Sequence, residues 1–584
     1  MASIYEPLPC LDRHIRLLEL KPGNPNEIVT TKLTIQNLDD APDYEALSYT
    51  WDISKDQQTI KCDGKLLSVA PNLFDALLRL RDSKSEITLW IDAICINQDD
   101  MEEIGHMVRQ MPLIYASARR TVCWIACPLS QQAADLLEDL EELRNRLSNQ
   151  RSCSTTSDIY HSDYKITAKM LEDSTKANRI QDTEAWQQLN SFIQNSYFSR
   201  IWIMQDIVCS KTLVIKTPAN DVTWERLCSA IEAGLLFSYQ HSMPPTSANI
   251  LVANQFRRNN KTLSDLRDFM IAEQTVMKVS AAIPRDLIYA PLNMFGAEEL
   301  SPDTLGINMK IGYSNTAYTT YTRAELEIGH ICLSLARWTP KQDPNLPSWA
   351  PDWGSSQVRL LLSHRKSSFC ASSRPAATTR TDPYSPGALL VAGSSVDFVA
   401  EIACCLPPRR HCDHYNIAGV NILIFDEWFE FVKDEIDRRK ARRATEVDAL
   451  VQFVETVQAK GCNTIWAPSS LEDKSSNIER AREFIEFLNS EEAESTVELR
   501  LFYAACYPAH GRRIGFTRKG RLGLFPEEAR RGDVVTILDG CKVPIILRER
   551  GQSFINIGES YVNGLMMGEG ELQSDFERTE FRIA

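Results

Sequence analysis

Residues 1–127 alternate short apolar segments with amphipathic helical patterns. Apolar residues at helical spacing follow the first of these segments, and Leu73, Leu77 and Leu80 share one helical face. Strands are expected at 46–51, 89–96 and 121–125, and helices at about 72–80 and 100–118. This alternation predicts a parallel sheet with right-handed crossovers. Two further strands, expected within residues 1–43, lead into the sheet.

One charged residue, Asp92, interrupts the apolar segment 89–96. An unpaired buried carboxylate is costly or becomes protonated, so Asp92 is expected at the carboxyl end of its strand, where it is paired or faces a cleft. Asn97 and Gln98 follow, and acidic residues then begin the next helix. Open α/β sheets bind ligands at this kind of corner. A structural role for Asp92, such as helix capping or pairing with Arg200, is an equal alternative.

The carboxyl-terminal part of the chain changes to a β pattern. Short β-prone segments occur at 513–517, 521–525, 533–538, 543–550 and 553–561. Turn signals at Lys519-Gly520, Asp539-Gly540 and Gly551 separate them, which predicts a small antiparallel barrel or meander. The segment 390–405 is expected in the same layer.

The three patterns divide the chain into three regions. Residues 1–210 are expected to form an α/β domain, with an insertion near 129–180 that contains an acidic helix and a polar run. Residues 211–345 have a mainly helical pattern, and residues 346–584 form a mixed region that ends in the antiparallel unit. The role of residues 366–480 is open. A length of 584 residues fits two to four domains.

Composition excludes several classes of function. A formal net charge of −14 argues against binding nucleic acid or an anionic membrane non-specifically. The amino terminus has no secretion signal, and no apolar run is long enough to span a bilayer. The 16 cysteines are unclustered and mostly lie in apolar surroundings, as free thiols in a reducing compartment do. A cytoplasmic protein is therefore expected.

Common cofactor motifs are missing. Neither the dinucleotide fingerprint with its three glycines nor the phosphate-binding loop with Lys-Ser/Thr is present. His411-Cys412-Asp413-His414, with Cys404 and Cys405 upstream, matches no usual zinc spacing, so no metal is expected. The basic run 438–443 lies among acidic residues in a helical pattern and is interpreted as a solvated helix face.

Four ordered blocks resemble the fungal heterokaryon incompatibility (HET) domain. They are YEALSYTW at 44–51, LWIDAICINQ at 89–98, IYASA at 114–118 and FSRIWIMQDI at 198–207. Three later blocks resemble parts of long HET-domain proteins: PRDLIYA at 284–290, PSWAPDW at 347–353 and GESYVNGLM at 558–566.

The resemblance implies a parallel-sheet fold similar to TIR and flavodoxin-like domains, and a role in non-self recognition that triggers cell death. Partner proteins or self-association through the HET domain are implied too. Some TIR domains hydrolyse NAD with a carboxylate on a helix, and Asp206 occupies the corresponding position here. The implied catalytic residues are Asp206, Asp92 and Ser48, and the implied residues for binding NAD as a substrate are Tyr49, Trp51, Asn97, Gln98, Arg200 and Trp202.

Four departures from the family pattern favour weak or no catalysis. Asp206 replaces a longer glutamate, and a displacement on the order of 1 Å costs roughly 10²-fold in a positioned reaction. Asp52 replaces a glycine, and Ile104 and Met107 replace Arg and Gln. Ser48 is a weak nucleophile candidate, since His106 is the one histidine near these motifs.

Two functional hypotheses therefore stay open: a signalling effector that acts by protein assembly, and an NAD-hydrolysing enzyme. The departures favour the first. The tryptophans Trp51, Trp90, Trp124 and Trp202 are interpreted as core residues rather than cofactor platforms.

Overall fold

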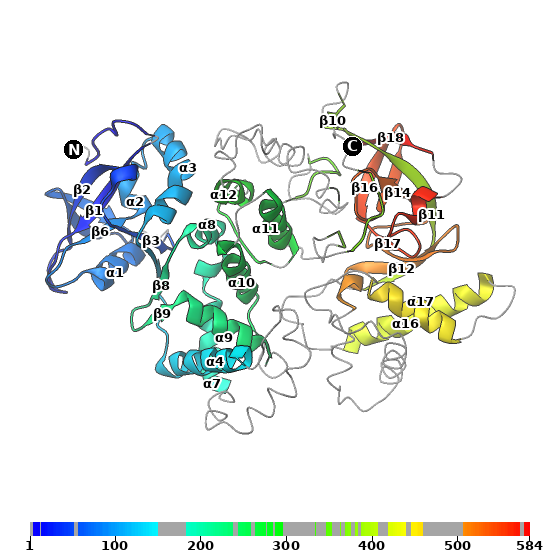
Figure 1. Cartoon of the computed structure of the whole chain (residues 1–584), viewed down its shortest axis with the longest axis horizontal. Helices are drawn as coiled ribbons and strands as arrows, with labels where there is room; N and C mark the ends of the chain where they lie inside the picture. Colours follow the sequence, from blue (N-terminus) through cyan, green and yellow to red (C-terminus); the bar gives the residue numbers. More distant parts are fainter. Residues whose placement is uncertain are drawn as a thin grey trace. The chain divides into compact units, whose positions relative to one another are not determined.

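The computed structural model describes the larger part of the chain. The described residues are 4–11, 13–51, 56–149, 183–236, 243–258, 263–275, 277–283, 286–295, 333, 346–352, 362–363, 368–374, 380–382, 387–406, 419–439, 446–459, 506–572 and 577–584. They fall into two compact units, of which the first contains the amino-terminal α/β sheet and the second the carboxyl-terminal β-sheet. The two units are described separately below (Figure 1).

The first unit is built on a nine-stranded mixed sheet with the order β5-β4-β2-β1-β6-β3-β7-β8-β9. The strands are β1 (His14–Leu20), β2 (Thr30–Asn37), β3 (Glu45–Tyr49), β4 (Gln58–Cys62), β5 (Lys65–Val69), β6 (Ile87–Trp90), β7 (Arg120–Trp124), β8 (Leu213–Lys216) and β9 (Asp221–Thr223). Strands β6, β3, β7 and β8 are parallel, as the strand–helix alternation predicts. All five residues of the central strand β3 are buried.

Two helices of the parallel core match their predicted positions. Helix α1 (Pro71–Leu80) begins with a proline in its first turn and buries Leu73, Leu77 and Leu80. Helix α3 (Met101–Ser117) is capped by Asp100, whose side chain accepts hydrogen bonds from the Glu102 and Glu103 amides. A short helix, α2 (Asp92–Cys95), lies between β6 and α3.

The sheet is wider than the sequence pattern indicates. The hairpin β4–β5 was not expected, although its turn, Asp63-Gly64, has positive φ at both residues and is a strong hairpin signal. Strands β8 and β9 continue the sheet to Thr223, whereas the sequence pattern placed residues 211–345 in a helical region. The predicted domain boundary at 210 stays a prediction, but the sheet itself crosses it.

The rest of the first unit is helical. The helices are α4 (Gln131–Asn149), α7 (Thr183–Ile193), α8 (Ile201–Cys209), α9 (Trp224–Leu236), α10 (Thr246–Arg257), α11 (Leu263–Thr275) and α12 (Asp286–Met294). Helix α4 matches the acidic helix expected at the start of the 129–180 segment, and it packs against α7 and α9 (Figure 1). Helix α8 packs against α3, α10, α12 and strand β3. It therefore brings its side chains to the carboxyl end of the parallel core.

The second unit contains a mostly antiparallel β-sheet with the order β14-β15-β16-β18-β11-β12-β13-β17. Its strands are β10 (Arg380–Thr381), β11 (Leu389–Cys405), β12 (Arg512–Thr517), β13 (Leu522–Pro526), β14 (Val534–Leu538), β15 (Ile545–Arg550), β16 (Ser553–Glu559), β17 (Tyr561–Val562) and β18 (Thr579–Ile583). An additional pairing of β14 with β11 closes five strands into a ring. The predicted barrel is thus confirmed, and β18 is a strand that the sequence pattern missed.

Strand β11 organises the barrel. It pairs in succession with β18, β14 and β12, and shifts of register along its length let it turn from one partner to the next. Its Val396 and Val399 belong to an apolar core cluster with residues of the later strands. The charged helices α16 (Gly419–Arg439) and α17 (Glu446–Val457) pack together and lie between β11 and β12 in the sequence, as expected.

Several sequence features lie outside the described residues. These are Asp52, the His411–His414 cluster and most of the 129–180 insertion.

Candidate functional site

A buried hydrogen-bonded chain connects β3 with α8. Ser48, near the carboxyl end of β3, donates a hydrogen bond from its Oγ to Oδ2 of Asp206 at 2.7 Å. The Tyr197 hydroxyl in turn donates to Ser48 Oγ at 2.9 Å. Ser48 is 1% exposed and Asp206 is 5% exposed. The structure thus brings together two of the three predicted catalytic residues and covers both of them.

Burial dominates the electrostatics of Asp206. It raises the pKa of this carboxyl group to about 8, and the charge of nearby Asp92 acts in the same direction. The hydrogen bond from Ser48, the neighbouring Tyr115 hydroxyl and the positive charge of Arg200 lower the pKa and offset part of this rise. The carboxyl group of Asp206 is therefore mostly protonated and uncharged at neutral pH.

Asp92 lies two residues after the end of β6 and is the first residue of α2. The strand expected at 89–96 is therefore wrong in its second half, because the chain turns into a short helix after Ile91. It is partly exposed. Its Oδ2 accepts a hydrogen bond from Nε1 of Trp51 at 3.0 Å, and its Oδ1 accepts one from the Ala93 amide at 2.7 Å. Burial raises the pKa of Asp92 to about 6, against the effects of these two donors and of Arg200.

Asp92 and Asp206 lie at one edge of the sheet. Asp92 follows the carboxyl end of β6, and Asp206 contacts Ser48 near the carboxyl end of the adjacent parallel strand β3. Each carboxyl group also lies within electrostatic range of Arg200, and Asp92 acts on the pKa of Asp206 directly. The expected juxtaposition of the two carboxyl groups is therefore present.

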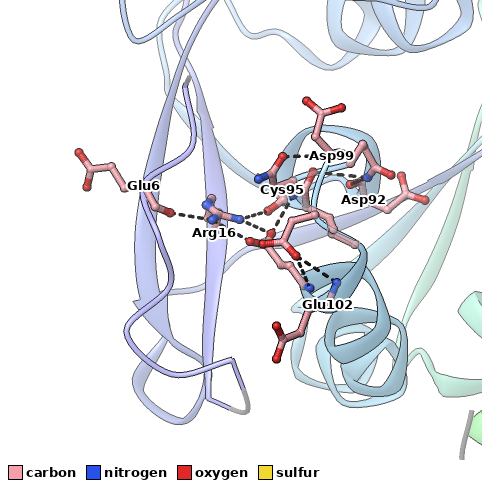
Figure 2. A network of polar contacts seen from close by, with 11 residues as sticks. Glu6, Arg16, Asp92, Cys95, Asp99 and Glu102 are labelled. Carbon is pink, nitrogen blue, oxygen red and sulfur yellow. Dashed lines mark hydrogen bonds and ion pairs between the residues drawn. The ribbon is translucent and has the colours of Figure 1, made fainter. Parts of the chain in front are cut away.

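A second polar network holds the loop that follows Asp92 (Figure 2). The Arg16 guanidinium, from β1, pairs with the Glu103 carboxylate of α3 at 2.5 Å, and both side chains are buried. Arg16 also donates to the carbonyl oxygens of Cys95 and Glu6, and Glu103 accepts a hydrogen bond from the Asn97 amide at 2.7 Å. This buried pair fixes the backbone at Asn97 next to the Asp92 turn.

The other predicted binding residues have diverse environments. Gln98 donates to the backbone carbonyl of Asp92 at 3.0 Å, so its amide supports the turn. Tyr49 is buried, and its pKa is raised well above the usual value by burial. Trp202 donates from Nε1 to Oδ2 of Asp286, on α12, at 2.9 Å. Gln98 and Trp202 thus make polar contacts within the protein.

The interpretation of all four tryptophans as core residues fits two of them. Trp90 and Trp124 are buried, Trp202 is partly exposed, and Trp51, which follows β3, is 42% exposed. Of the departures from the family pattern, Met107 is buried and Ile104 is partly exposed. Both replace polar residues of the family pattern on α3.

Sequence reasoning missed four residues of these networks: Tyr115, Tyr197, Arg16 and Glu103. For Arg16 a signal was available, because an arginine within the apolar strand sequence HIRLLEL requires a buried acceptor. The partners of Ser48 and Asp206 lie far away in the sequence and gave no local signal.

The arrangement limits the chemistry available. Ser48 donates to Asp206 and accepts from Tyr197, so its oxygen is engaged on both sides. A protonated Asp206 carboxyl group is a poor general base at neutral pH. Within the described residues, no cluster of three or more metal-ligating side chains occurs.

Two family models match this chain. One is "Heterokaryon incompatibility protein (HET)", which matches residues 44–206, and the other is "Het-6 beta-barrel domain", which matches residues 413–584. The first match covers strands β3 to β7, with Ser48 and Asp92, and helix α8 as far as Asp206, but not β1, β2, β8 or β9. The second covers the barrel strands β12 to β18 but not β11. The chain is therefore a member of the HET-domain protein family, with a Het-6 barrel.

The chain is similar to one named relative over nearly its whole length. This is "Heterokaryon incompatibility protein 6, OR allele" from Neurospora crassa, which is 22% identical over 665 residues of alignment. The alignment covers 98% of this chain and 96% of the relative. No solved structure matches the chain. None of the helices in the described part of the chain is long and apolar enough to cross a membrane.

Proposed function

We propose that this protein is a non-enzymatic effector of heterokaryon incompatibility. In this proposal it takes part in fungal non-self recognition in the cytoplasm and promotes cell death by assembling with protein partners or with itself. Similarity to the Neurospora protein along nearly the whole chain supports the biological role, because both terminal domains are included.

One observation carries the non-enzymatic part of the proposal: Asp206 is buried, and Ser48, which is itself buried, donates a hydrogen bond to it. A catalytic carboxylate needs to reach the substrate and to hold the charge that its role requires. Asp206 is 5% exposed, and burial raises its pKa to about 8. These properties suit a structural residue that links α8 to β3 through a hydrogen bond. They suit a catalytic residue that attacks or stabilises a ribose less well.

A second candidate function, NAD hydrolysis, is favoured by a different feature of the same sheet edge. Trp51 is 42% exposed and donates to the partly exposed carboxylate of Asp92. An exposed aromatic ring beside a carboxylate and an arginine is a plausible surface for binding a nucleotide. In this alternative Asp206 is the key carboxylate, and Ser48, Asp92 and Asn97 line the site.

Nicotinamide release distinguishes the two functions. Purified wild-type protein and the variants Asp206→Asn, Asp206→Glu and Asp206→Ala are incubated with NAD under identical conditions. We expect no release from any of them. If reach alone limits a catalytic Asp206, Asp206→Glu should instead raise the rate on the order of 10²-fold. Turnover by the wild type that Asp206→Ala abolishes would contradict the proposal.

Cell death gives the matching readout in vivo. The wild type and Asp206→Asn are expressed in fungal cells, and viability is scored together with protein abundance. Asparagine keeps the size of the side chain and an oxygen that accepts the Ser48 hydrogen bond. We therefore expect Asp206→Asn to retain cell-death activity. Loss of death at unchanged abundance would show that the carboxyl group itself is required.

A further inference from the structure

One edge of the nine-stranded sheet is open. Strand β5 stands at the end of the strand order and pairs on one side with β4. Across the two-residue turn, Cys62 faces Lys65 and Lys61 faces Leu66. Because hydrogen-bonded and non-hydrogen-bonded pairs alternate from such a turn, the peptide groups of Leu66 and Ser68 point away from β4. Within the described part of the first unit, no further strand pairs with this edge.

The side chains on this edge include an exposed leucine. Leu66 is 72% exposed, and it shares one face of the hairpin with the exposed residues Thr59, Lys61 and Ser68. Natural proteins usually protect an open edge by keeping it short or by placing charges on it. A solvent-exposed leucine on a free edge, next to Lys65, leaves this edge only partly protected.

The edge is also held in a fixed shape. Asp63 and Gly64 have φ values of 48° and 78°, which is the geometry of a tight hairpin turn. Oδ2 of Asp63 accepts a hydrogen bond from the Leu33 amide at 3.1 Å, and this ties the hairpin tip to β2. A partner strand would therefore meet a preorganised template, which lowers the entropic cost of association.

The opposite edge of the same sheet provides an internal comparison. Strand β9 has three residues, and its Asp221 pairs with Arg79 at 2.8 Å and with Lys216 at 2.6 Å. It is short and carries paired charges, which are the usual protections against strand addition. Strand β5 has five residues, and its one charged residue, Lys65, lies at its end beside the turn, so the two edges differ in their capacity to pair.

We propose that β5 is an assembly surface to which β5 of a second copy of this chain adds in antiparallel orientation. This inference rests on the assembly function proposed above and names its contact. A two-fold axis through Leu67 places Leu66 opposite Ser68 of the second copy and Lys65 opposite Val69 of the second copy. No like charges then face each other directly, and the two Leu66 side chains lie on one diagonal.

The proposed contact between the two β5 strands is small, which limits the affinity of the two copies for each other. One five-residue strand pair forms a small interface, so association is expected to be weak. Assembly through β5 would therefore respond to the local concentration of the protein.

Sedimentation of the full-length chain over a range of concentrations tests the proposal. The wild type should form a dimer at high concentration. Leu66→Lys places like charges near one another, and Ser68→Pro removes an outward N–H while leaving the bonds to β4 intact. Both should weaken dimerisation at least tenfold. The matched control is Leu572→Lys, because Leu572 is 87% exposed but lies in the second unit. It should dimerise as the wild type does.

Two results would overturn the assignment of β5: a wild type that stays monomeric throughout the range, or a Leu66→Lys variant that dimerises as strongly as the wild type. Thermal unfolding of each variant verifies that the fold is retained. Cell death scored in parallel keeps the two proposals apart. If the Leu66→Lys variant still dimerises and still causes cell death, the β5 contact is rejected and the proposed effector function stands.

Discussion

Two buried carboxyl groups, one in each unit, have contrasting surroundings. In the barrel, Glu559 is paired with Arg512 at 2.7 Å and also accepts hydrogen bonds from the amides of Leu362 and Ser363. In the HET sheet, Asp206 has the neutral hydroxyl of Ser48 as its hydrogen-bond donor. Burial raises the pKa of both groups, but at Glu559 a fully buried guanidinium acts against the rise.

This difference shows how one type of residue can serve two purposes. Glu559 is held as a charge, so its removal or the loss of its partner leaves a buried ion uncompensated. Asp206 is held as a neutral acid, so it can stay buried without an ionic partner as long as it keeps its proton. The composition of the chain does not show which carboxyl groups are buried. Once a carboxyl group is buried, the charge of its partner decides whether it is protonated.

The largest effect is expected from breaking the barrel pair. Arg512→Ala should lower the free energy of unfolding of the second unit by about 3–5 kcal/mol, because it leaves Glu559 charged and unpaired in the interior. Denaturant unfolding followed by tryptophan fluorescence measures the change. Arg531→Ala is the control, since Arg531 meets Glu401 at 3.5 Å on the surface and should cost less than about 1 kcal/mol. Equal losses from the two variants would contradict the account.

A smaller effect, of opposite sign, is expected at Asp206. Its pKa in the folded protein, about 8, lies above the ordinary value of 3.8, so the unfolded chain ionises first as the pH rises. Stability is therefore lost between about pH 4 and pH 8, and Asp206→Asn escapes this loss. Relative to the wild type, the variant should gain on the order of a few kcal/mol from pH 4.5 to pH 8, since one pKa unit corresponds to about 1.4 kcal/mol.

Urea unfolding of both proteins at the two pH values provides this comparison. Only the change of the difference with pH is interpreted, so any packing cost of asparagine cancels. Glu559→Gln serves as the counterpart and should destabilise the protein at pH 8, because it removes the charge that pairs with Arg512. A stability difference between Asp206→Asn and the wild type that stays constant with pH would mean that Asp206 titrates normally.

The smallest effect concerns the exposed rim. Trp51 donates to Asp92, whose pKa is raised to about 6, so the emission of Trp51 should change as this carboxyl group titrates. The difference in fluorescence between the wild type and Trp51→Phe should have a midpoint near pH 6, and Asp92→Asn should abolish it. Trp51→Phe should lower the free energy of unfolding by less than about 1 kcal/mol, since Trp51 is exposed. A midpoint near pH 4 would show that burial does not raise the pKa of Asp92.

The sequence predicted the central frame well because that frame depends on local periodicity. Helix α1, helix α3 and the strands β3 and β7 follow directly from apolar spacing and capping residues, whereas β6 ends before Asp92 and was predicted too long. The position of Asp92 after β6 follows from the cost of burying a charge in a strand. The family resemblance placed Asp206 near this corner, and the hydrogen bond from Ser48 agrees with that placement.

The remainder required contacts that are distant in sequence. Tyr197 and Asp206 reach Ser48 across about 150 residues, and no local pattern encodes that encounter. The hairpin β4–β5 was missed because its outer face is polar, although its Asp63-Gly64 turn was visible in the sequence. The exposure of Trp51 depends on where β3 ends, which is the kind of boundary that periodicity fixes least well.

The protonation state of Asp206 at neutral pH is the central claim, and difference infrared spectroscopy tests it most directly. A protonated carboxyl group has a carbonyl stretching band that a carboxylate lacks, and Asp206→Asn removes only the contribution of this residue. If Asp206 is protonated, the wild type minus Asp206→Asn spectrum contains this band at pH 7 and loses it as the pH is raised past about 8. A difference spectrum with a carboxylate signature at pH 7 would contradict the account and restore Asp206 as a charged, potentially catalytic group.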